Sequence, residues 1–336
     1  MAGPEPGRLG KFFHDQTRAA FAATQECYIL GCEAKPIGAH SVANSRLLRA
    51  IADDGHVIYF NPARLGDAGL PELVETGRNK ATVFPGVCKE HDEIFAPIDD
   101  RAYVPGDKEQ EYLFALRASA REFTIRSAMV HQHRALLDEL KAGTIDPALG
   151  QPQPEGVEFM EQFGVGFGRG LEDLEADREF FKATWDRRRF WKIDTEVVEV
   201  GQELPIVASS AFNLELDPNG NQVNDLANAS ATMRPFYFTL FPQDGKSYAL
   251  LSWHHSHARA YEGVVGVGKW DEEAKKVAVS NLLTGHVENF AANPTYWRAL
   301  PPELAAEFER YFGMSMFTPQ VPFIYDDRFS LFVPLA

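Results

Sequence analysis

The sequence has little cysteine, no long apolar run and no excess of basic residues, and each lack excludes a class of protein. Its 336 residues include only three cysteines. Three cysteines are too few for a disulfide framework, and an odd number leaves one unpaired. We therefore expect the protein to reside in a reducing compartment. No stretch approaches 18 uncharged apolar residues, which argues against a membrane span. The first residues also lack the apolar core of a secretory signal. We therefore expect a cytoplasmic protein without a membrane partner.

Positive charge is scarce and unevenly distributed. Lysine and arginine total 33 against 48 aspartate and glutamate, a formal net charge of −15. The same count gives −3 for residues 1–106, −4 for 107–195 and −8 for 196–336. Because neutralisation of phosphates dominates nucleic-acid affinity, any nucleic-acid partner is expected to contact residues 1–195. The acidic C-terminal part is better suited to a protein partner or a small ligand.

Three regions differ in their pattern, and together they predict an α+β fold. Residues 1–106 contain short elements broken by turns. Residues 107–191 show apolar residues at helical spacing, interrupted by Gly143 and a proline-containing linker at 144–154, which predicts a helical hairpin. Residues 192–336 alternate with a period near two, then return to helical patterns, which predicts a β-rich acidic domain with C-terminal helices. An Asp244-Gly245 turn between two apolar runs predicts a β-hairpin there.

All three cysteines lie in the first region, in two clusters that include one histidine. Cys27 and Cys32 are separated by four residues, and Cys88 and His91 by two. A tetrahedral zinc site takes four nitrogen or sulfur ligands, usually as two close pairs joined by a loop. No cysteine is left over, and the fourth donor lies at the right offset. We therefore predict a structural Cys3His zinc site, although each cysteine alone would more often be a buried apolar residue.

The order of elements around these pairs is similar to a treble-clef zinc finger, as found in a group of uncharacterised bacterial proteins and in HNH-type nucleases. The resemblance covers about residues 25–100. It is carried by Gly38-Ala39-His40-Ser41, Asn44, Leu47-Leu48, Ile51, Gly55-His56-Val57, Ala81-Thr82 and Cys88-x2-His91-Asp92-x2-Phe95-x2-Ile98-Asp99.

The likeness to HNH-type nucleases implies a catalytic role for two further residues. It implies that His40, eight residues after Cys32, acts as general base, and that Asp92 helps to hold a catalytic metal. A site of His40 and Asp92, with Asn44 or His56 as a further donor, could take Mg²⁺ or a second Zn²⁺ through oxygen and nitrogen atoms. The HNH pattern has a further His or Asn on its last helix, and no His follows Asp92 here. A structural role for His40 and Asp92, as hydrogen-bonding groups near the knuckle, is the alternative.

Other polar clusters favour ordinary structural explanations. The arginines Arg187, Arg188 and Arg189 next to aromatic residues, extended by Arg117, Arg121 and Arg126, suit nucleic acid. Solvated helix positions explain them more simply. His255 and His257 at a strand end resemble a metal pair but lack an evident third ligand, so a polar strand-end cluster is expected.

Two functions from different classes remain open. In the first, zinc only scaffolds a surface that recognises a protein or a ligand. In the second, residues 1–106 form a divergent metal-dependent nuclease that acts on DNA or RNA through His40 and Asp92.

Overall fold

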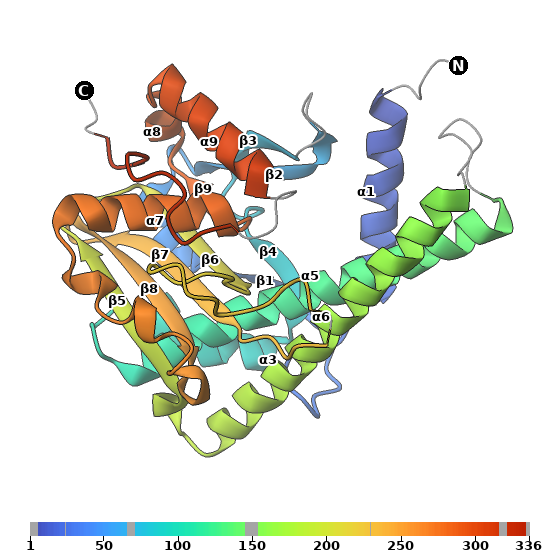
Figure 1. Ribbon diagram of the computed structural model, residues 1–336, viewed down its shortest axis with the longest axis horizontal. Coiled ribbons are helices and arrows are strands. Elements are labelled where there is room, and N and C mark those ends of the chain that lie inside the picture. Colours follow the sequence, from blue (N-terminus) through green and yellow to red (C-terminus); the bar gives the residue numbers. More distant parts are fainter. Residues whose placement is uncertain are drawn as a thin grey trace.

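Two antiparallel sheets and a set of helices make up the fold seen in the computed structural model (Figure 1). The structure describes residues 6–23, 25–65, 71–144, 154–228, 230–315 and 321–333. The mixture of helix and sheet agrees with the expected α+β class.

The smaller sheet pairs only β1 (Ile37–His40) with β4 (Val83–Val87). The helical elements of the same part of the chain are α1 (Pro6–Ala23), η1 (Asn44–Leu48), α2 (Arg49–Ile51), α3 (Lys89–Asp92), η2 (Glu93–Phe95) and α4 (Ala96–Asp99). The long helix α1 was not expected, since the sequence pattern indicated only short elements before residue 107.

The larger sheet has seven strands in the order β3-β2-β9-β6-β7-β8-β5, and every neighbouring pair is antiparallel. The strands are β2 (His56–Leu65), β3 (Pro71–Gly77), β5 (Ile193–Val200), β6 (Ile206–Phe212), β7 (Phe236–Gln243), β8 (Lys246–His254) and β9 (Phe290–Ala292). The early and late strands meet where Ile58 of β2 pairs with Ala292 of β9. The sheet therefore continues across the boundaries expected at residues 106 and 191.

The hairpin expected around Asp244-Gly245 joins β7 and β8, and Gln243 pairs with Lys246 beside the turn. Asp244 and Gly245 have φ values of 55° and 78°. Positive φ at both central residues is the requirement of a type I′ turn, whose twist matches that of the two strands. Aspartate followed by glycine meets this requirement at little cost, so the local sequence determines the turn.

Strand β7 is buried on both faces, which explains its continuous apolar sequence. Phe236, Phe238 and Leu240 belong to one core cluster, whereas Tyr237 and Phe241 belong to the other. Side chains alternate between the faces of a strand, so these residues separate the two cores. The sheet is consequently the middle of three layers.

One outer layer consists mainly of two long helices, α5 (Lys108–Ala142) and α6 (Pro154–Asp186), which lie side by side (Figure 1). With 35 residues, α5 is about 52 Å long at the usual rise per residue. The Asp107 carboxylate accepts hydrogen bonds from the backbone N–H groups of Glu109 and Gln110 and caps its first turn. The helix ends before Gly143, as expected. Residues 145–153 of the expected linker lie outside the described residues.

The other outer layer contains α7 (Glu272–His286), α8 (Pro294–Arg298) and α9 (Pro302–Ser315). Short helical turns complete the C-terminal half: η4 (Phe190–Lys192), η5 (His255–His257), η6 (Glu262–Val264) and η7 (Val267–Lys269). Leu282 and Leu283 of α7 pack in the core that also contains Phe236 and Phe238. The helices α7 and α9 agree with the return to helical patterns expected near the C-terminus.

Candidate metal centre

The first cysteine pair lies on a tight turn between α1 and β1. The backbone N–H of Cys32 donates to the carbonyl of Ile29 at 3.2 Å, and Gly31 has a φ of 80°. Glycine adopts this left-handed conformation without steric cost, so it allows the chain to bring Cys32 back toward Cys27. The Tyr28 N–H donates to the Gly86 carbonyl at 2.7 Å and attaches this turn to β4.

The second pair is positioned by the end of β4 and the start of α3. Cys88 immediately precedes α3, and His91 lies within it. Residues three apart on a helical turn lie on one side, so both donors face the same point.

Gly86 of β4, unlike Gly31, is needed because it leaves space for a neighbouring helix. A Cβ on Gly86 would lie 2.4 Å from Thr124 Oγ1 of α5, so glycine permits close approach of the strand to that helix.

The structure brings all four expected ligands together. The ligand atoms of Cys27, Cys32, Cys88 and His91 lie within 4.8 Å of one another. His91 Nδ1 is 3.4 Å from Cys27 Sγ and 3.2 Å from Cys88 Sγ, and the sulfurs of Cys32 and Cys88 are 3.8 Å apart. In the described part of the chain, no other group of three or more such side chains has this arrangement. The cluster is compatible with a metal site.

Burial and hydrogen bonding act differently on two of the thiols. Burial raises the pKa of Cys27 to about 11. Burial also acts to raise the pKa of Cys88, but hydrogen bonds from the His91 backbone and from neighbouring thiols outweigh it and lower that pKa. The Cys27 thiol therefore holds its proton more tightly than a free thiol does, and the Cys88 thiol loses its proton more easily. A metal ion must displace these protons to bind.

Arg178 of α6 donates hydrogen bonds to the backbone of the first cysteine turn. The sequence alone did not identify this residue. Its guanidinium donates to the carbonyl of Cys27 at 2.6 Å and to the carbonyl of Tyr28, and it lies 3.3 Å from a Glu26 carboxylate oxygen. The same group lies over the Phe123 ring, 4.7 Å from its centroid. Only 5 % of Arg178 is exposed, so a buried cation fixes the backbone of the turn.

A buried chain of hydrogen bonds continues from this turn to the large sheet. Tyr28 and Ser119 share a hydrogen bond at 2.8 Å, and Ser119 Oγ donates to the Asp177 carboxylate. Tyr237 donates to the same carboxylate at 2.5 Å, and His254 Nε2 lies 2.7 Å from it. Because partnered buried polar groups hold their neighbours in one arrangement, the cysteine turn, α5, α6 and the sheet are positioned together.

His40 lies at the end of β1 and outside the cysteine cluster. Its Nδ1 is 3.0 Å from the carbonyl oxygen of Ala81 and 3.4 Å from Thr82 Oγ1. Burial lowers the pKa of His40, and the positive charge of Arg117 acts in the same direction. The ring is therefore neutral near pH 7.

Asp92 ends α3, directly after the ligand His91. Burial raises the pKa of Asp92. The positive charge of Arg117 acts to lower this pKa, and the negative charge of Asp99 acts to raise it. Arg117 and Asp99 also act on the pKa of His40, so His40 and Asp92 lie near one charged pair. Neither His40 nor Asp92 belongs to a group of three or more metal-ligating side chains among the described residues. A second metal there would need further ligands from water or substrate.

The candidate basic patch is largely engaged within the protein. Arg117 makes two hydrogen bonds of 2.7 Å to the Asp99 carboxylate and is only 3 % exposed. Arg126 pairs with Glu122 at 3.1 Å, and Arg188 lies over the Trp185 ring. The expectation of solvated positions therefore holds for Arg187, Arg188 and Arg189, which are exposed, and is wrong for Arg117, which is buried against Asp99.

The histidine cluster after β8 also has internal partners. His255 lies 3.0 Å from an Asp194 carboxylate oxygen, whereas His257 stacks against His254 with ring centroids 5.2 Å apart. The two rings therefore contact different neighbours, and the expected polar strand-end cluster accounts for them.

No family model, curated protein or solved structure matches this chain. Among the helices that the structure describes, none combines the length and apolar character needed to cross a bilayer. Statements about function therefore depend on the chemistry of these side chains.

Proposed function

We propose that the chain holds one zinc ion in a structural site formed by Cys27, Cys32, Cys88 and His91. Zinc bonds of about 2.3 Å to sulfur and about 2.0 Å to nitrogen give tetrahedral edges of about 3.8 Å between sulfurs and about 3.5 Å between sulfur and nitrogen. Here the sulfurs of Cys32 and Cys88 lie 3.8 Å apart, and His91 Nδ1 lies 3.4 Å and 3.2 Å from the sulfurs of Cys27 and Cys88. This agreement is the observation that carries the proposal.

A closed ligand set supports a structural rather than a catalytic ion. Catalytic zinc sites keep one position open for water or substrate, whereas structural sites use four protein ligands. Cys27 and Cys88 are almost fully buried, at 0 % and 2 % exposure. The ion would join the turn before β1 to the junction of β4 and α3. The order of the first cysteine turn, the sheet of β1 and β4, and α3 is the basis on which we propose a treble-clef-like module.

We assign the zinc the task of holding a recognition surface for a protein or a ligand. The sheet of β1 and β4 has only two strands, and an isolated two-stranded sheet is marginally stable in water. The ion and Arg178 together fix both ends of the segment that contains these two strands. Three free thiols also suit the reducing cytoplasm, where we propose that the protein acts.

Metal analysis of purified wild type and ligand variants tests the site. We expect one zinc per chain in wild type and loss of zinc in Cys88→Ser. His91→Ala should also lose zinc, whereas His91→Cys replaces one good ligand by another and should retain it. His56→Ala, at an exposed histidine outside the cluster, is the matched control. Folded wild type without zinc, or Cys88→Ser with a full complement, would refute the site.

One observation favours a second candidate, a metal-dependent nuclease with His40 as general base. A carbonyl can only accept a hydrogen bond, so the contact with Ala81 places the His40 proton on Nδ1. Nε2 then carries the lone pair, and the lowered pKa of His40 keeps it free to take a proton from water near neutral pH. Asp92 would help to hold Mg²⁺ or a second Zn²⁺.

Nuclease assays on DNA and RNA with Mg²⁺, Mn²⁺ or Zn²⁺ separate the two candidates. If His40 is the base, His40→Ala should lose at least about 100-fold in rate, while His131→Ala, at an exposed histidine of α5, keeps wild-type activity. Cleavage that persists in His40→Ala would eliminate this second candidate.

A further inference from the structure

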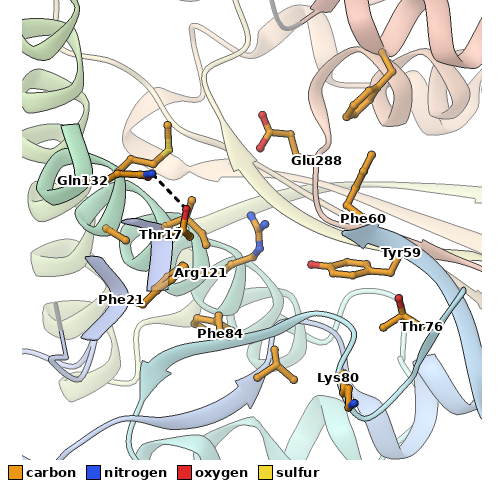
Figure 2. Close-up of a pocket in the computed structure, with 15 residues that line it drawn as sticks. Thr17, Phe21, Tyr59, Phe60, Thr76, Lys80, Phe84, Arg121, Gln132 and Glu288 are labelled. Carbon is orange, nitrogen blue, oxygen red and sulfur yellow. Dashed lines mark hydrogen bonds between the residues drawn. The ribbon is translucent and has the colours of Figure 1, made fainter. Parts of the chain in front are cut away.

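A pocket of about 560 Å³ lies between α1, β2, β3, β4, α5 and α9, outside the cysteine cluster (Figure 2). Small-molecule sites usually enclose about 300–1,000 Å³ and combine apolar walls with a few converging polar groups. The volume of this pocket falls within that range, and its lining has the same mixed character.

Aromatic rings form much of the wall. Phe60 of β2 stacks on Phe312 of α9, with ring centroids 4.9 Å apart and planes 21° from parallel. Tyr59, Phe84 and Phe21 add rings from β2, β4 and α1. Flat ring surfaces favour a flat aromatic ligand, because such ligands stack on them.

Three charged side chains line the same space: Arg121 of α5, Lys80 before β4, and Glu288 between α7 and β9. Within the described residues, none of the three side chains makes a hydrogen bond. The Arg121 guanidinium forms a long ion pair with the Glu122 carboxylate at 3.9 Å, and only 13 % of the Arg121 side chain is exposed. A largely buried guanidinium whose one ion pair is long can accommodate a further acceptor.

Glu288 is held in place by its neighbour Asn289. The fully buried Asn289 amide donates to Ser41 Oγ at 2.9 Å and to the Ser209 carbonyl, and accepts from Tyr59. Figure 2 shows Glu288 and Arg121 entering the pocket from different elements. No ion pair joins the two among the described residues, although the positive charge of Arg121 acts to lower the pKa of Glu288 against the effect of burial.

We propose that this pocket binds a small aromatic anion that also carries hydrogen-bond donors, the chemistry of a nucleoside monophosphate. The phosphate pairs with Arg121, whose planar fork suits phosphate oxygens, and Lys80 adds positive charge. The base stacks against Phe60, Tyr59 and Phe21, the rings of the pocket that are only partly buried. An amino group of the base donates to Glu288.

This proposal rests on the recognition role proposed above, because β4, which leads into Cys88, supplies one wall of the pocket. A free nucleotide and the phosphorylated end of a nucleic-acid strand offer the same chemistry. They differ in length, and a binding experiment can distinguish them.

Calorimetric titration of the metal-loaded full chain tests the proposal with adenosine 5′-monophosphate, adenosine, inorganic phosphate and a short 5′-phosphorylated oligonucleotide. We expect the monophosphate to bind better than adenosine or phosphate alone. Arg121→Gln should weaken it at least about tenfold, as loss of a charged hydrogen bond predicts, and Glu288→Gln should also weaken it. Arg49→Gln, at an exposed arginine outside the pocket, should have no effect.

Equal affinity of the monophosphate for wild type and Arg121→Gln would overturn the assignment, and so would absence of binding to wild type. If the oligonucleotide binds as tightly as the monophosphate and is equally weakened by Arg121→Gln, the natural ligand is a strand end. If it does not bind, the ligand is a free nucleotide. Zinc content is measured on the same samples. Nucleotide binding without zinc refutes only the metal site, and zinc without nucleotide binding refutes only the pocket assignment.

Discussion

Arg178 donates a hydrogen bond of 2.6 Å to the carbonyl oxygen of Cys27, although 150 residues separate them in the chain. Through this contact α6 holds the backbone that presents the first expected metal ligand. Outer contacts of this kind orient the ligands of metal sites and affect metal affinity.

Arg178→Met should weaken both the fold and the metal site. The methionine keeps most of the apolar stem but leaves two buried carbonyls without their donor, which should cost about 3 kcal/mol of unfolding free energy. Metal affinity should fall about tenfold or more. Denaturant unfolding and competition with a chelator measure the two effects. Arg169→Met, on the same helix at an exposed position, should change stability by less than about 0.5 kcal/mol. Similar behaviour of the two variants would contradict this role for Arg178.

Metal binding should release protons. Since burial raises the pKa of Cys27 to about 11 in the metal-free cluster, that thiol is protonated near pH 7.5 and must lose its proton to become a ligand. We expect one to three protons released per ion, and a fall in metal affinity as the pH is lowered. Titration calorimetry in buffers of different ionisation enthalpy gives the number. His91→Cys should release more protons than wild type, and release of none would contradict thiolate ligation.

Gly164→Ala and Gly166→Ala should change stability in opposite directions. A Cβ at Gly164 would lie 2.7 Å from Cε1 of the buried His133 ring on α5, whereas a Cβ at Gly166 meets nothing within 4 Å. We therefore expect Gly164→Ala to destabilise the protein by about 1–3 kcal/mol through overpacking. Gly166→Ala should stabilise it by about 0.5–1 kcal/mol through helix propensity. Thermal and denaturant unfolding distinguish them, and equal shifts would contradict the close packing of α5 and α6.

Acidification should destabilise the fold partly through His286. Burial lowers its pKa to about 4, its Nε2 has no hydrogen-bond partner among the described residues, and its ring stacks on Phe212 with centroids 4.8 Å apart. The unfolded imidazole titrates near about 6.5, so the unfolded chain takes up the proton first. The neutral buried imidazole therefore contributes about 2–3 kcal/mol to the free energy of unfolding. This contribution is fully present above about pH 6.5 and is lost as the pH falls toward 4.

His286→Phe should keep the stack on Phe212 and remove this pH dependence. Unfolding free energies measured between pH 7 and 4 should therefore fall less in the variant than in wild type. His131→Gln, at an exposed position on α5, should follow the wild-type profile. A variant that loses as much stability as wild type over this range would show that His286 is not responsible.

The four metal ligands could be predicted from the sequence because each pair of them lies within a few residues of chain. Cys27 and Cys32 are close in the chain, as are Cys88 and His91, and each pair needs only a turn to bring its donors together. The Asp244-Gly245 hairpin is predictable for the same reason, since the φ values of two adjacent residues determine it. In both cases a few neighbouring residues specify the geometry.

What could not be predicted depends on contacts between distant segments. Arg178 looks like any arginine on an amphipathic helix until the rotation of α6 relative to Cys27 is known. The pairing of Ile58 with Ala292 likewise has no local signal, because β9 has only three residues, all of them apolar, and could pair with several other strands. The pocket around Arg121 and Glu288 exists only after these elements are assembled.

The central position of the three-residue strand β9 has a consequence for synthesis of the chain. β9 lies between β2 and β6, so the seven strands cannot be joined until residue 292 has left the ribosome. Until then β2 presents an open edge of unpaired backbone groups, a form that favours association with other chains. The sheet is therefore completed only after β9, the last of its strands in the chain, has been synthesised. A ribosome that stalls before β9 releases a chain in which the pair of β2 and β3 is not joined to the other strands of the sheet.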